Sequence, residues 1–397
     1  NYTMSISRIA ENKLQMYLNT YPCVAIVGPR QVGKTTTAKD LQKYTDRECI
    51  YLDLESDEDI QKLRNAEQYF DARQDKLIIL DEIQRDLRLF PLLRSVIDKN
   101  RENGRFVLLG SASPELLASS SETLAGRIAY IEMHPFLYPE IKSDFHFDSL
   151  WLKGGFPAYF LQEDEETSLE MRLQFIQTYI ERELPLLGLA VSPTVLKNLL
   201  RLIAHTQGQI INYTSYANSL GVQVNTVKRY LDYFENAFLI RRLESYHPNT
   251  KKRIVKSPTI FIRDTGVLHT LFNIENHEDL AGFSGKGSSW ESFVIQQIVA
   301  LLKPNISPYF YRTQDGTELD LVLVAGIVPA VGIEIKLSNA PKITKGTTIA
   351  SQDFGDMPIY VVTHSTTEDY AYSDTVTVTS FERILLILRE KGLLLAH

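Results

Sequence analysis

The run from Gly28 to Thr36 brings together the residue types that bind phosphate. In order they are Gly28, Pro29, Arg30, Gln31, Val32, Gly33, Lys34, Thr35 and Thr36. Glycines at the two ends of a short loop let backbone N–H groups wrap a phosphate chain that side chains would block. Lys34 would reach the β- and γ-phosphates, and the Thr35 hydroxyl would ligate magnesium. The spacing therefore predicts a site for ATP, with Mg²⁺ as its cofactor.

Two carboxylates end a nearby apolar run and supply the other half of this chemistry. Asp81 and Glu82 directly follow Leu77–Leu80. We expect Asp81 to hold the magnesium ion through water, and Glu82 to orient and polarise the water that attacks the γ-phosphate. Without a phosphate loop upstream, the same pair would indicate only a solvated turn. After such a loop, catalytic roles for Lys34 and Glu82 are favoured.

Ser111 and Arg127 are two further candidates for catalysis. Ser111 follows the apolar run Phe106–Leu109 and Gly110, at a point where a polar residue would lie beside the γ-phosphate, and Ser113 is the alternative. Arg127 would place a guanidinium on the transferring phosphate, either in its own chain or in a neighbouring subunit. The alternative for Arg127 is a plain surface ion pair.

A second constellation lies in the last third of the chain. Asp320 stands in one apolar, strand-like run, and Glu334 and Lys336 stand two residues apart in the next, so both project from one face of a strand. Charged side chains in such strands are costly unless they are paired or metal-bound. Together with Glu291, on a helix upstream, the carboxylates can hold Mg²⁺ while Lys336 positions water for phosphodiester attack. The alternative is a buried ion-pair cluster without activity.

The elements that position the first constellation lie in residues 1–140. Helical patterns at Thr36–Tyr44 and Leu87–Lys99 separate apolar, β-branched runs. Such alternation predicts an α/β domain in which a parallel sheet is covered by helices on both faces. The predicted strands are Cys23–Val27, Cys49–Leu54, Lys76–Leu80, Arg105–Leu109 and Ile128–Met133.

Residues 141–265 favour a helical domain that contains a helix-turn-helix. Short helices are expected at Tyr213–Val222 and Asn225–Leu231, and Phe238–Leu243 is placed to form a wing. Basic residues gather in this region, at Lys228, Arg229, Arg241, Arg242, Lys251, Lys252, Arg253 and Lys256. They indicate contact with DNA phosphates, with a protein-binding module as the alternative. Asp264, after an apolar strand, is expected to cap a helix.

Residues 266–397 return to mixed character and predict a second α/β domain. A helix over Ser289–Leu302 precedes the strands, and a helix over Phe381–Glu390 closes the chain. The predicted strands are Tyr309–Arg312, Glu318–Val324, Ala330–Leu337 and Pro358–Val362.

Composition limits the classes of protein that this chain can be. A length of 397 residues, 44% hydrophobic and 23% charged, predicts a globular protein of two or three domains. A net charge of -7 argues against a protein that grips nucleic acid over its whole surface. Two cysteines, the absence of a membrane-length apolar run and a polar start to the chain predict a cytoplasmic protein.

Several motifs resemble a prokaryotic AAA-type ATPase family whose members carry a C-terminal domain of uncharacterised function. They are the loop from Gly28 to Thr36, Asp81 to Gln84, Leu109 to Ser111, Leu124 to Arg127, Gly154 to Pro157 and Arg263 to Gly266. The resemblance covers nearly the whole chain. It implies ATP binding, ATP hydrolysis and a homo-oligomer, by analogy a hexamer, that completes sites between subunits.

The C-terminal constellation also resembles the restriction-endonuclease-like superfamily. Its pattern is an Asp followed by Glu-x-Lys on adjacent strands, here Asp320, Glu334 and Lys336, with Glu291 at the helix position. The resemblance implies a nuclease-like α/β domain.

Two functions fit these patterns. The first is an ATP-driven machine that acts on nucleic acid through the winged-helix and nuclease-like domains. The second is an ATP-dependent switch that binds a protein partner, with an inactive nuclease-like scaffold. A small-molecule kinase would leave the later domains without a purpose.

Overall fold

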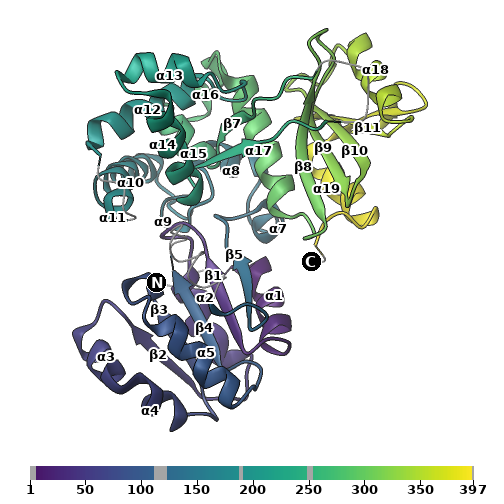
Figure 1. Ribbon diagram of the computed structural model, residues 1–397. Coiled ribbons are helices and arrows are strands. Elements are labelled where there is room, and N and C mark those ends of the chain that lie inside the picture. Colours follow the sequence, from purple (N-terminus) through teal and green to yellow (C-terminus); the bar gives the residue numbers. More distant parts are fainter. Residues whose placement is uncertain (1–5, 111–122, 187–190, 248–253, 396–397) are drawn as a thin grey trace. The chain divides into compact units, whose positions relative to one another are not determined.

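The computed structural model describes residues 6–110, 123–186, 191–247 and 254–395 (Figure 1). The chain divides into two compact units. The first comprises the residues up to 145 together with 156–161 and 236–238, and the second comprises 146–155, 162–235 and 239 onward. The first unit is close to the predicted domain 1–140. The predicted second and third domains lie together in the second unit.

The first unit is built on five parallel strands in the order β2-β3-β4-β1-β5. Every residue of β1, β3 and β4 is buried, because helices cover both faces of the sheet. Each strand lies within one residue of its predicted position. The strands are β1 (Cys23–Val27), β2 (Cys49–Asp53), β3 (Leu77–Asp81), β4 (Phe106–Gly110) and β5 (Ile128–Glu132).

Short helices surround this sheet. They are α1 (Ile9–Leu18), α2 (Lys34–Lys39), α3 (Asp57–Lys62), α4 (Ala66–Asp71), α5 (Leu89–Lys99), α7 (Tyr138–Ile141) and α9 (Pro157–Phe160), with 3-10 turns η1 (Asp40–Lys43), η2 (Leu63–Asn65) and η3 (Ile83–Arg85). The predicted start of the second helix, Thr36, is wrong by two residues. Gly33 precedes α2 in the left-handed region, with φ 98°, so the helix begins directly after it at Lys34.

The second unit opens with helices, two of which flank a glycine turn. Gly221 ends α13 in the left-handed region, and α14 begins three residues later, which is the order of elements predicted from the sequence. The helices are α8 (Phe147–Lys153), α10 (Glu165–Thr178), a π-helical turn η4 (Tyr179–Glu183), α11 (Leu184–Leu186), α12 (Pro193–His205), α13 (Tyr213–Leu220), α14 (Val224–Asn236), α15 (Thr265–Leu271), α16 (His277–Gly282) and α17 (Lys286–Ala300). An antiparallel pair, β6 (Ile240–Leu243) and β7 (Thr259–Ile262), follows α14.

The remaining strands form a six-stranded sheet in the order β12-β13-β11-β10-β9-β8. β9 runs antiparallel to both β8 and β10, whereas β11 runs parallel to β10 and β13. The elements are β8 (Ile306–Arg312), β9 (Glu318–Ala325), β10 (Val328–Ile335), α18 (Lys345–Asp353), β11 (Ile359–Thr363), β12 (Tyr370–Ala371), β13 (Val376–Ser380) and α19 (Phe381–Glu390). Ser245 and Ile254, on either side of the β6–β7 hairpin tip, make bridges to Phe310 and Thr313 at β8. The hairpin is therefore tied to the edge of this sheet.

Two glycine-containing motifs lock together inside the second unit. Asp264 caps α15 as predicted, because Oδ1 accepts from Val267 N at 3.0 Å, while Oδ2 accepts from Gly155 N at 2.8 Å. A Cβ on Gly154 would stand 2.2 Å from Asp264 Oδ1, and one on Gly266 would stand 1.9 Å from the Lys153 carbonyl oxygen. Only glycine fits where these two backbones cross.

Among the described residues, every helix is either too short or too polar to cross a bilayer.

Candidate functional site

The loop from Gly28 to Gly33 leaves β1 and leads directly into α2. A Cβ on Gly28 would stand 2.3 Å from the Met133 carbonyl oxygen, which follows β5. Gly33 takes a left-handed φ of 98° that most other residues adopt only with strain. Both glycines are therefore required by the backbone, and the loop has the strand–turn–helix setting that a phosphate loop needs.

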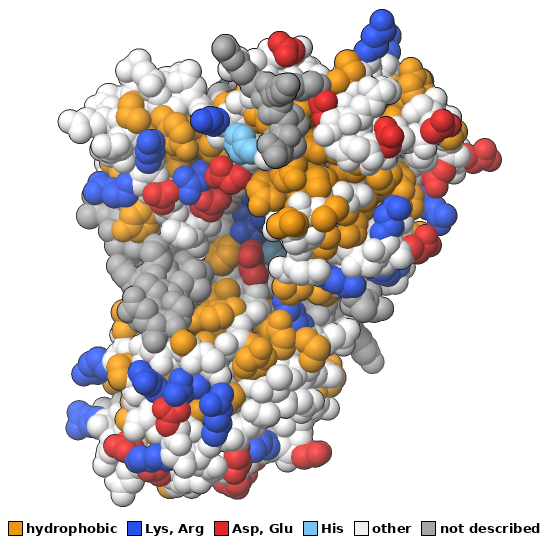
Figure 2. Space-filling view, turned by 45° about the vertical axis from the view of Figure 1, so that its right-hand side comes forward, with side chains coloured by type: hydrophobic (Ala, Val, Ile, Leu, Met, Phe, Trp, Pro, Cys, Tyr) orange, Lys and Arg blue, Asp and Glu red, His pale blue; other side chains and the backbone are white. Residues whose placement is uncertain are grey.

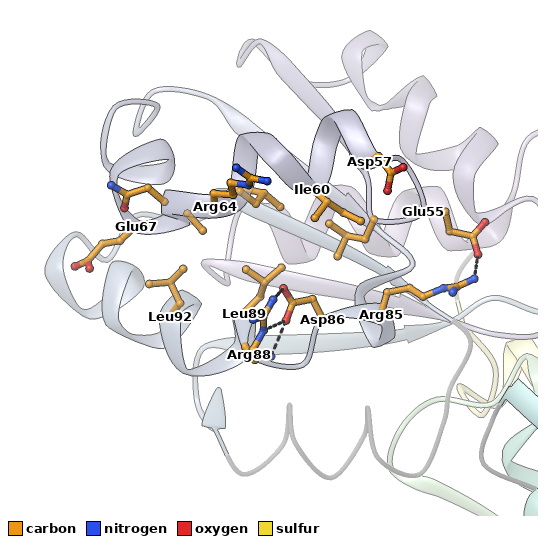
Figure 3. Close-up of a pocket in the computed structure, with 14 residues that line it drawn as sticks. Glu55, Asp57, Ile60, Arg64, Glu67, Arg85, Asp86, Arg88, Leu89 and Leu92 are labelled. Atoms are coloured by element: carbon orange, nitrogen blue, oxygen red, sulfur yellow. Dashed lines mark hydrogen bonds and ion pairs between the residues drawn. The ribbon is translucent and has the colours of Figure 1, made fainter.

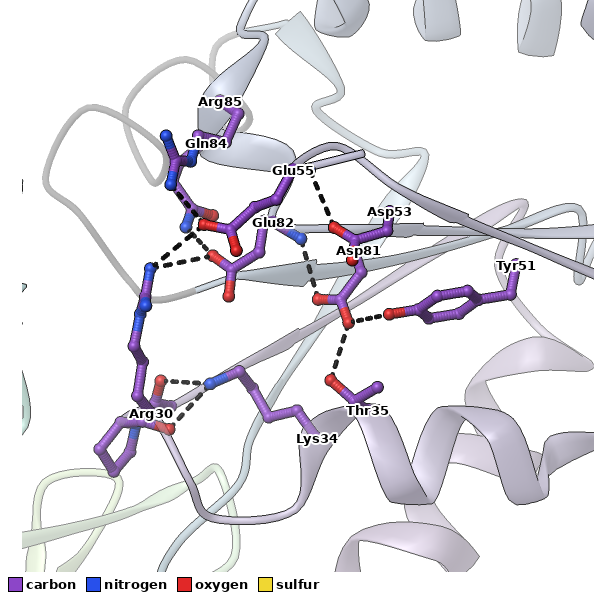
Figure 4. Close-up of polar contacts among 12 residues, drawn as sticks. Arg30, Lys34, Thr35, Tyr51, Asp53, Glu55, Asp81, Glu82, Gln84 and Arg85 are labelled. Carbon is purple, nitrogen blue, oxygen red and sulfur yellow. Dashed lines mark hydrogen bonds and ion pairs between the residues drawn. The ribbon is translucent and has the colours of Figure 1, made fainter. Parts of the chain in front are cut away.

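Lys34 lies inside this loop. Its Nζ donates to the carbonyl oxygens of Gly28 at 2.9 Å and Pro29 at 2.8 Å (Figure 4). The side chain is buried. Its ammonium group therefore lies within the curve of the loop, where phosphate oxygens would offer charged acceptors in place of these carbonyls.

Asp81, at the end of β3, faces the start of α2. Its Oδ2 accepts from Thr35 Oγ1 and from Tyr51 Oη, both at 2.7 Å, and its Oδ1 accepts from Glu82 N at 2.9 Å. Burial, and then the bond to Asp81, raise the pKa of Tyr51. The Thr35 hydroxyl beside a carboxylate is an all-oxygen donor set that suits Mg²⁺, so these two residues fit the predicted cofactor.

Glu82 takes an unusual backbone conformation. With φ 54° and ψ 42°, it lies in the left-handed region, which is strained for a residue other than glycine, asparagine or aspartate. Its Oε2 accepts from Gln84 Nε2 and lies 3.7 Å from Arg30 Nη2. The carboxylate thus turns toward the phosphate loop (Figure 4).

The two remaining predicted catalytic residues have different outcomes. Ser111 lies outside the described residues, although β4, which leads to it, does lie between β1 and β3. Arg127 precedes β5 at the amino end of the sheet, where its carbonyl accepts from Cys23 N. The phosphate loop starts at the other end of β1, about 13 Å away along five residues. Arg127 is therefore out of reach of the phosphate loop of its own chain.

The Arg127 guanidinium instead forms an ion pair with Asp98 of α5. Its Nε and Nη2 donate to the two carboxylate oxygens at 2.6 and 2.8 Å. The predicted alternative, a surface ion pair, is thus what the chain itself shows. A role on the phosphate of a neighbouring subunit stays a prediction.

Sequence reasoning missed two residues, Arg8 and Tyr51, that hold the phosphate loop and Asp81 in place through hydrogen bonds. Arg8 donates from Nη1 to Val32 O in the loop at 2.7 Å, and from Nη2 to His134 O at 2.6 Å. Its Nε donates to Glu140 at 3.2 Å, and both side chains are buried. Arg8 and Tyr51 stand far from the motif in sequence, so nothing in the spacing marks them.

In the second unit, the four predicted residues of the C-terminal constellation come together. Lys336 Nζ lies 2.9 Å from Glu334 Oε1, and Thr347 of α18 donates to Glu334 Oε2 at 2.5 Å. Asp320 Oδ2 accepts from Ile335 N at 2.6 Å. Glu291 is close enough to Asp320 for their charges to interact.

This cluster contains three carboxyl groups and one ammonium group, and burial shifts the pKa of several of them. Burial raises the pKa of Asp320 to about 6, against the opposing effect of Lys336. Burial and Asp320 raise the pKa of Glu291. Burial alone would lower the pKa of Lys336, but Asp320 and Glu334 raise it overall. Across the part of the chain that the structure describes, no group of three His, Cys, Asp or Glu side chains is arranged to hold a metal ion.

Comparison with known proteins identifies the first unit. Residues 20–142 match the family model described as an AAA domain. Over 378 residues the chain is 36% identical to uncharacterised proteins of Mycobacterium tuberculosis and Mycobacterium bovis, covering 95% of this chain and 84% of each relative. The chain belongs to the same P-loop ATPase family as these proteins. Lys34, Thr35 and Asp81 all lie within the residues that match the AAA domain.

The rest of the chain matches domains without an assigned function. Residues 144–278 match a domain of unknown function (DUF8612), and residues 286–384 match another (DUF4143). Among solved structures, the Walker-type ATPase of Pyrococcus abyssi gives a TM-score of 0.48 at 17% identity, over 68% of this chain and 97% of that chain. RuvB of Thermotoga maritima gives a TM-score of 0.31 at 18% identity, over 60% of this chain and 90% of that chain. The family membership rests on the mycobacterial relatives and the AAA domain.

The basic residues of the middle region divide into two groups. Arg241 bonds to Gln296, and Arg242 pairs with Asp232 and Glu235, so both are engaged within the unit. Lys251, Lys252 and Arg253 lie outside the described residues. Lys228, Arg229 and Lys256 are exposed. On the face drawn in Figure 2, basic and acidic side chains are interspersed, so the basic residues on that face form small groups rather than one continuous basic surface.

A groove of about 1020 Å³ opens on the ATPase unit between α3–α4 and the turn after Glu82 (Figure 3). Its apolar lining includes Leu54, Leu63 and Leu89, and charged residues line it too. One of them, Glu55, pairs with Arg85 and also lies 3.9 Å from Arg30. Glu55 therefore both lines the groove and lies near Arg30 of the phosphate loop.

Proposed function

We propose that this protein binds ATP with Mg²⁺ in its first unit and hydrolyses it. One observation carries the proposal. A phosphate loop, the Thr35–Asp81 pair at 2.7 Å and a strained Glu82 come together at the carboxyl ends of the parallel strands. Such convergence supplies phosphate binding, a magnesium position and a carboxylate for the attacking water in one place.

Each residue would have a definite task. Lys34 would move from the carbonyls of Gly28 and Pro29 to the β- and γ-phosphates. Thr35 and Asp81 would hold Mg²⁺, which when bound neutralises charge on the phosphates. Glu82 would orient a water molecule whose oxygen bonds to the γ-phosphorus while the bond from phosphorus to the β-phosphate oxygen breaks. The proton released by the water passes to Glu82, and the electron pair leaves with ADP.

The test is a pair of variants measured for binding and turnover. Glu82→Gln should bind Mg·ATP as the wild type does and lose at least about 100-fold in kcat, because the amide no longer accepts a proton. Lys34→Ala should lose nucleotide binding in calorimetry. Wild-type protein that takes up no nucleotide with magnesium present would contradict the proposal.

We propose further that ATP turnover is coupled to nucleic acid. What supports this is the exposed surface of the helix-turn-helix, where Lys228 and Arg229 lie on α14 and are accessible. Lys228→Ala/Arg229→Ala should weaken DNA binding and flatten its dependence on salt. If neither DNA nor RNA binds or changes ATPase activity, the alternative stands: a homo-oligomer, by analogy a hexamer, that switches a protein partner.

The C-terminal cluster supports a second candidate function, metal-dependent cleavage of phosphodiesters. The observation that favours it is the convergence of Glu291 of α17, Asp320 of β9, Glu334 of β10 and Lys336 directly after β10. A group of three metal ligands is absent from the described residues, so Mg²⁺ here would be held by two carboxylates and water. Cleavage of DNA or RNA with Mg²⁺ or Mn²⁺ should be lost in Asp320→Ala and Lys336→Ala, and kept in Glu82→Gln without ATP. The absence of any cleavage would leave an inactive scaffold.

A further inference from the structure

One arginine of the ATPase unit lies beside the carboxylate that is proposed to hold the attacking water. Arg30, the third residue of the phosphate loop, directs its Nη2 to within 3.7 Å of Glu82 Oε2 and 3.9 Å of Glu55 Oε1. Glu82 is the carboxylate that would hold the attacking water, and Lys34, four residues on, would hold the γ-phosphate. Figure 4 shows the Arg30 side chain reaching toward Glu82. A transferring phosphoryl group held between Glu82 and Lys34 would therefore lie beside the Arg30 guanidinium.

We infer that Arg30 acts in cis on the transferring phosphate, as a catalytic residue of its own subunit's site. The inference rests on the proposed ATP hydrolysis and goes beyond loop binding, for which only the backbone at this position is needed. As water attacks and the bond to the β-phosphate breaks, negative charge builds on the equatorial and leaving oxygens. A planar guanidinium with paired donors stabilises that charge.

Before nucleotide arrives, Arg30 is in contact with carboxylates. Its ion pairs with Glu82 and Glu55, at 3.7 and 3.9 Å, are longer than a hydrogen bond. A γ-phosphate brings more negative charge and offers charge-assisted hydrogen bonds of roughly 2.8 Å. When Arg30 moves from Glu82 to the γ-phosphate, the Glu82 carboxylate also becomes free to hold the attacking water. Arg85, which pairs with Glu55, can take up the second carboxylate that Arg30 leaves.

The same geometry excludes the other arginine that the sequence offers for this task within the chain. Arg127 lies at the amino end of β1, the opposite end from the phosphate loop, and is held by Asp98. With Arg30 supplied in cis, each subunit carries its own guanidinium. Turnover per subunit should then be independent of subunit assembly.

The test uses full-length Arg30→Met, with Arg88→Met as the matched control. Arg88 is an exposed arginine on the same unit whose partner is Asp86. At saturating ATP, Arg30→Met should lose at least about 100-fold in kcat while its ADP affinity changes less than about fivefold. Arg88→Met should hydrolyse ATP as the wild type does. Wild-type turnover per subunit should stay constant over a range of about a thousandfold in protein concentration, from about nanomolar to micromolar.

A second readout separates catalysis from structure. The wild type should trap ADP with aluminium fluoride, a mimic of the transferring phosphate, and Arg30→Met should not trap it although it binds ADP. Hydrolysis by Arg30→Met at or above the wild-type rate would overturn the inference and show that Arg30 only restrains Glu82. Wild-type turnover that rises with protein concentration and is lost in Arg127→Met would also overturn it, in favour of an arginine in trans. A wild type without ATPase activity would instead contradict the proposed function.

Discussion

At the scale of single residues, the site depends on polar atoms whose hydrogen-bond partners are well defined. Asp81 uses one carboxylate oxygen for Thr35 and Tyr51 and the other for the backbone of Glu82. Its orientation is therefore set before any ligand arrives, which reduces the reorganisation needed during the reaction. Arg8 does the same for the loop itself through its hydrogen bond to the carbonyl oxygen of Val32.

Arg8→Ala should destabilise the ATPase unit by about 3 kcal/mol, because it leaves Glu140 as a buried carboxylate without its cation. It also removes two hydrogen bonds to the loop and its neighbour. Scanning calorimetry of the full chain measures the loss, and ADP affinity should fall with it. Unchanged stability would show that Glu140 finds another partner.

His269 of the second unit is fully buried between Leu152 O and Ser289 Oγ. Burial lowers its pKa to about 4. Because the unfolded chain takes up the proton near pH 6.5, the stability that neutral His269 contributes is present above that pH and is lost as the pH falls toward 4. The loss amounts to about 3 kcal/mol.

Urea unfolding followed by tryptophan fluorescence tests this, since Trp151 and Trp290 both lie in the second unit. Stability should fall more steeply between pH 7 and pH 4 in the wild type than in His269→Asn. Equal slopes would show that His269 is not the titrating group.

At the scale of elements, two crossings of backbone decide where the helices and strands lie. Gly28 allows the phosphate loop to pass against the backbone after β5, and Gly154 and Gly266 allow the start of α15 to pass against the end of α8. Asp264 then joins the two segments through Gly155. At these positions the neighbouring segment occupies the space that a Cβ would need, so only glycine fits.

Gly266→Ala should therefore destabilise the second unit by at least about 2 kcal/mol, because its Cβ would overlap the Lys153 carbonyl at 1.9 Å. Gly287→Ala, in α17, is the matched control, since a Cβ there meets nothing within 4 Å. That variant should be neutral or up to about 1 kcal/mol more stable. Tryptophan fluorescence during urea unfolding measures both. Equal effects of the two substitutions would contradict the crossing.

At the scale of the whole molecule, the chain is two compact units, and the residues of the proposed nucleotide site all lie in the first. The C-terminal cluster lies entirely in the second, where the middle helices and the six-stranded sheet form one body. The two proposed chemistries are thus carried by separate bodies, which can be stabilised separately.

Mg·ADP at about 100 times its dissociation constant should stabilise the first unit by about 2.7 kcal/mol. For a unit of this size that raises its calorimetric transition by about 5–11 °C. The tryptophan-detected transition of the second unit should move by less than about 1 °C. An equal shift of both transitions would show that the two units unfold as one.

The sequence by itself determined the phosphate loop, the Asp81–Glu82 pair, the five strands of the first sheet and the C-terminal set around Asp320. Loop, strand and helix there are short-range patterns, so spacing along the chain carries the information. Tertiary structure alone decided what lies near in space but far along the chain. It joined Arg8 to the loop and Tyr51 to Asp81, and it put Arg127 at the wrong end of β1 for its own site. Which end of a strand a side chain reaches depends on how strands are ordered and paired, and no local pattern encodes that order.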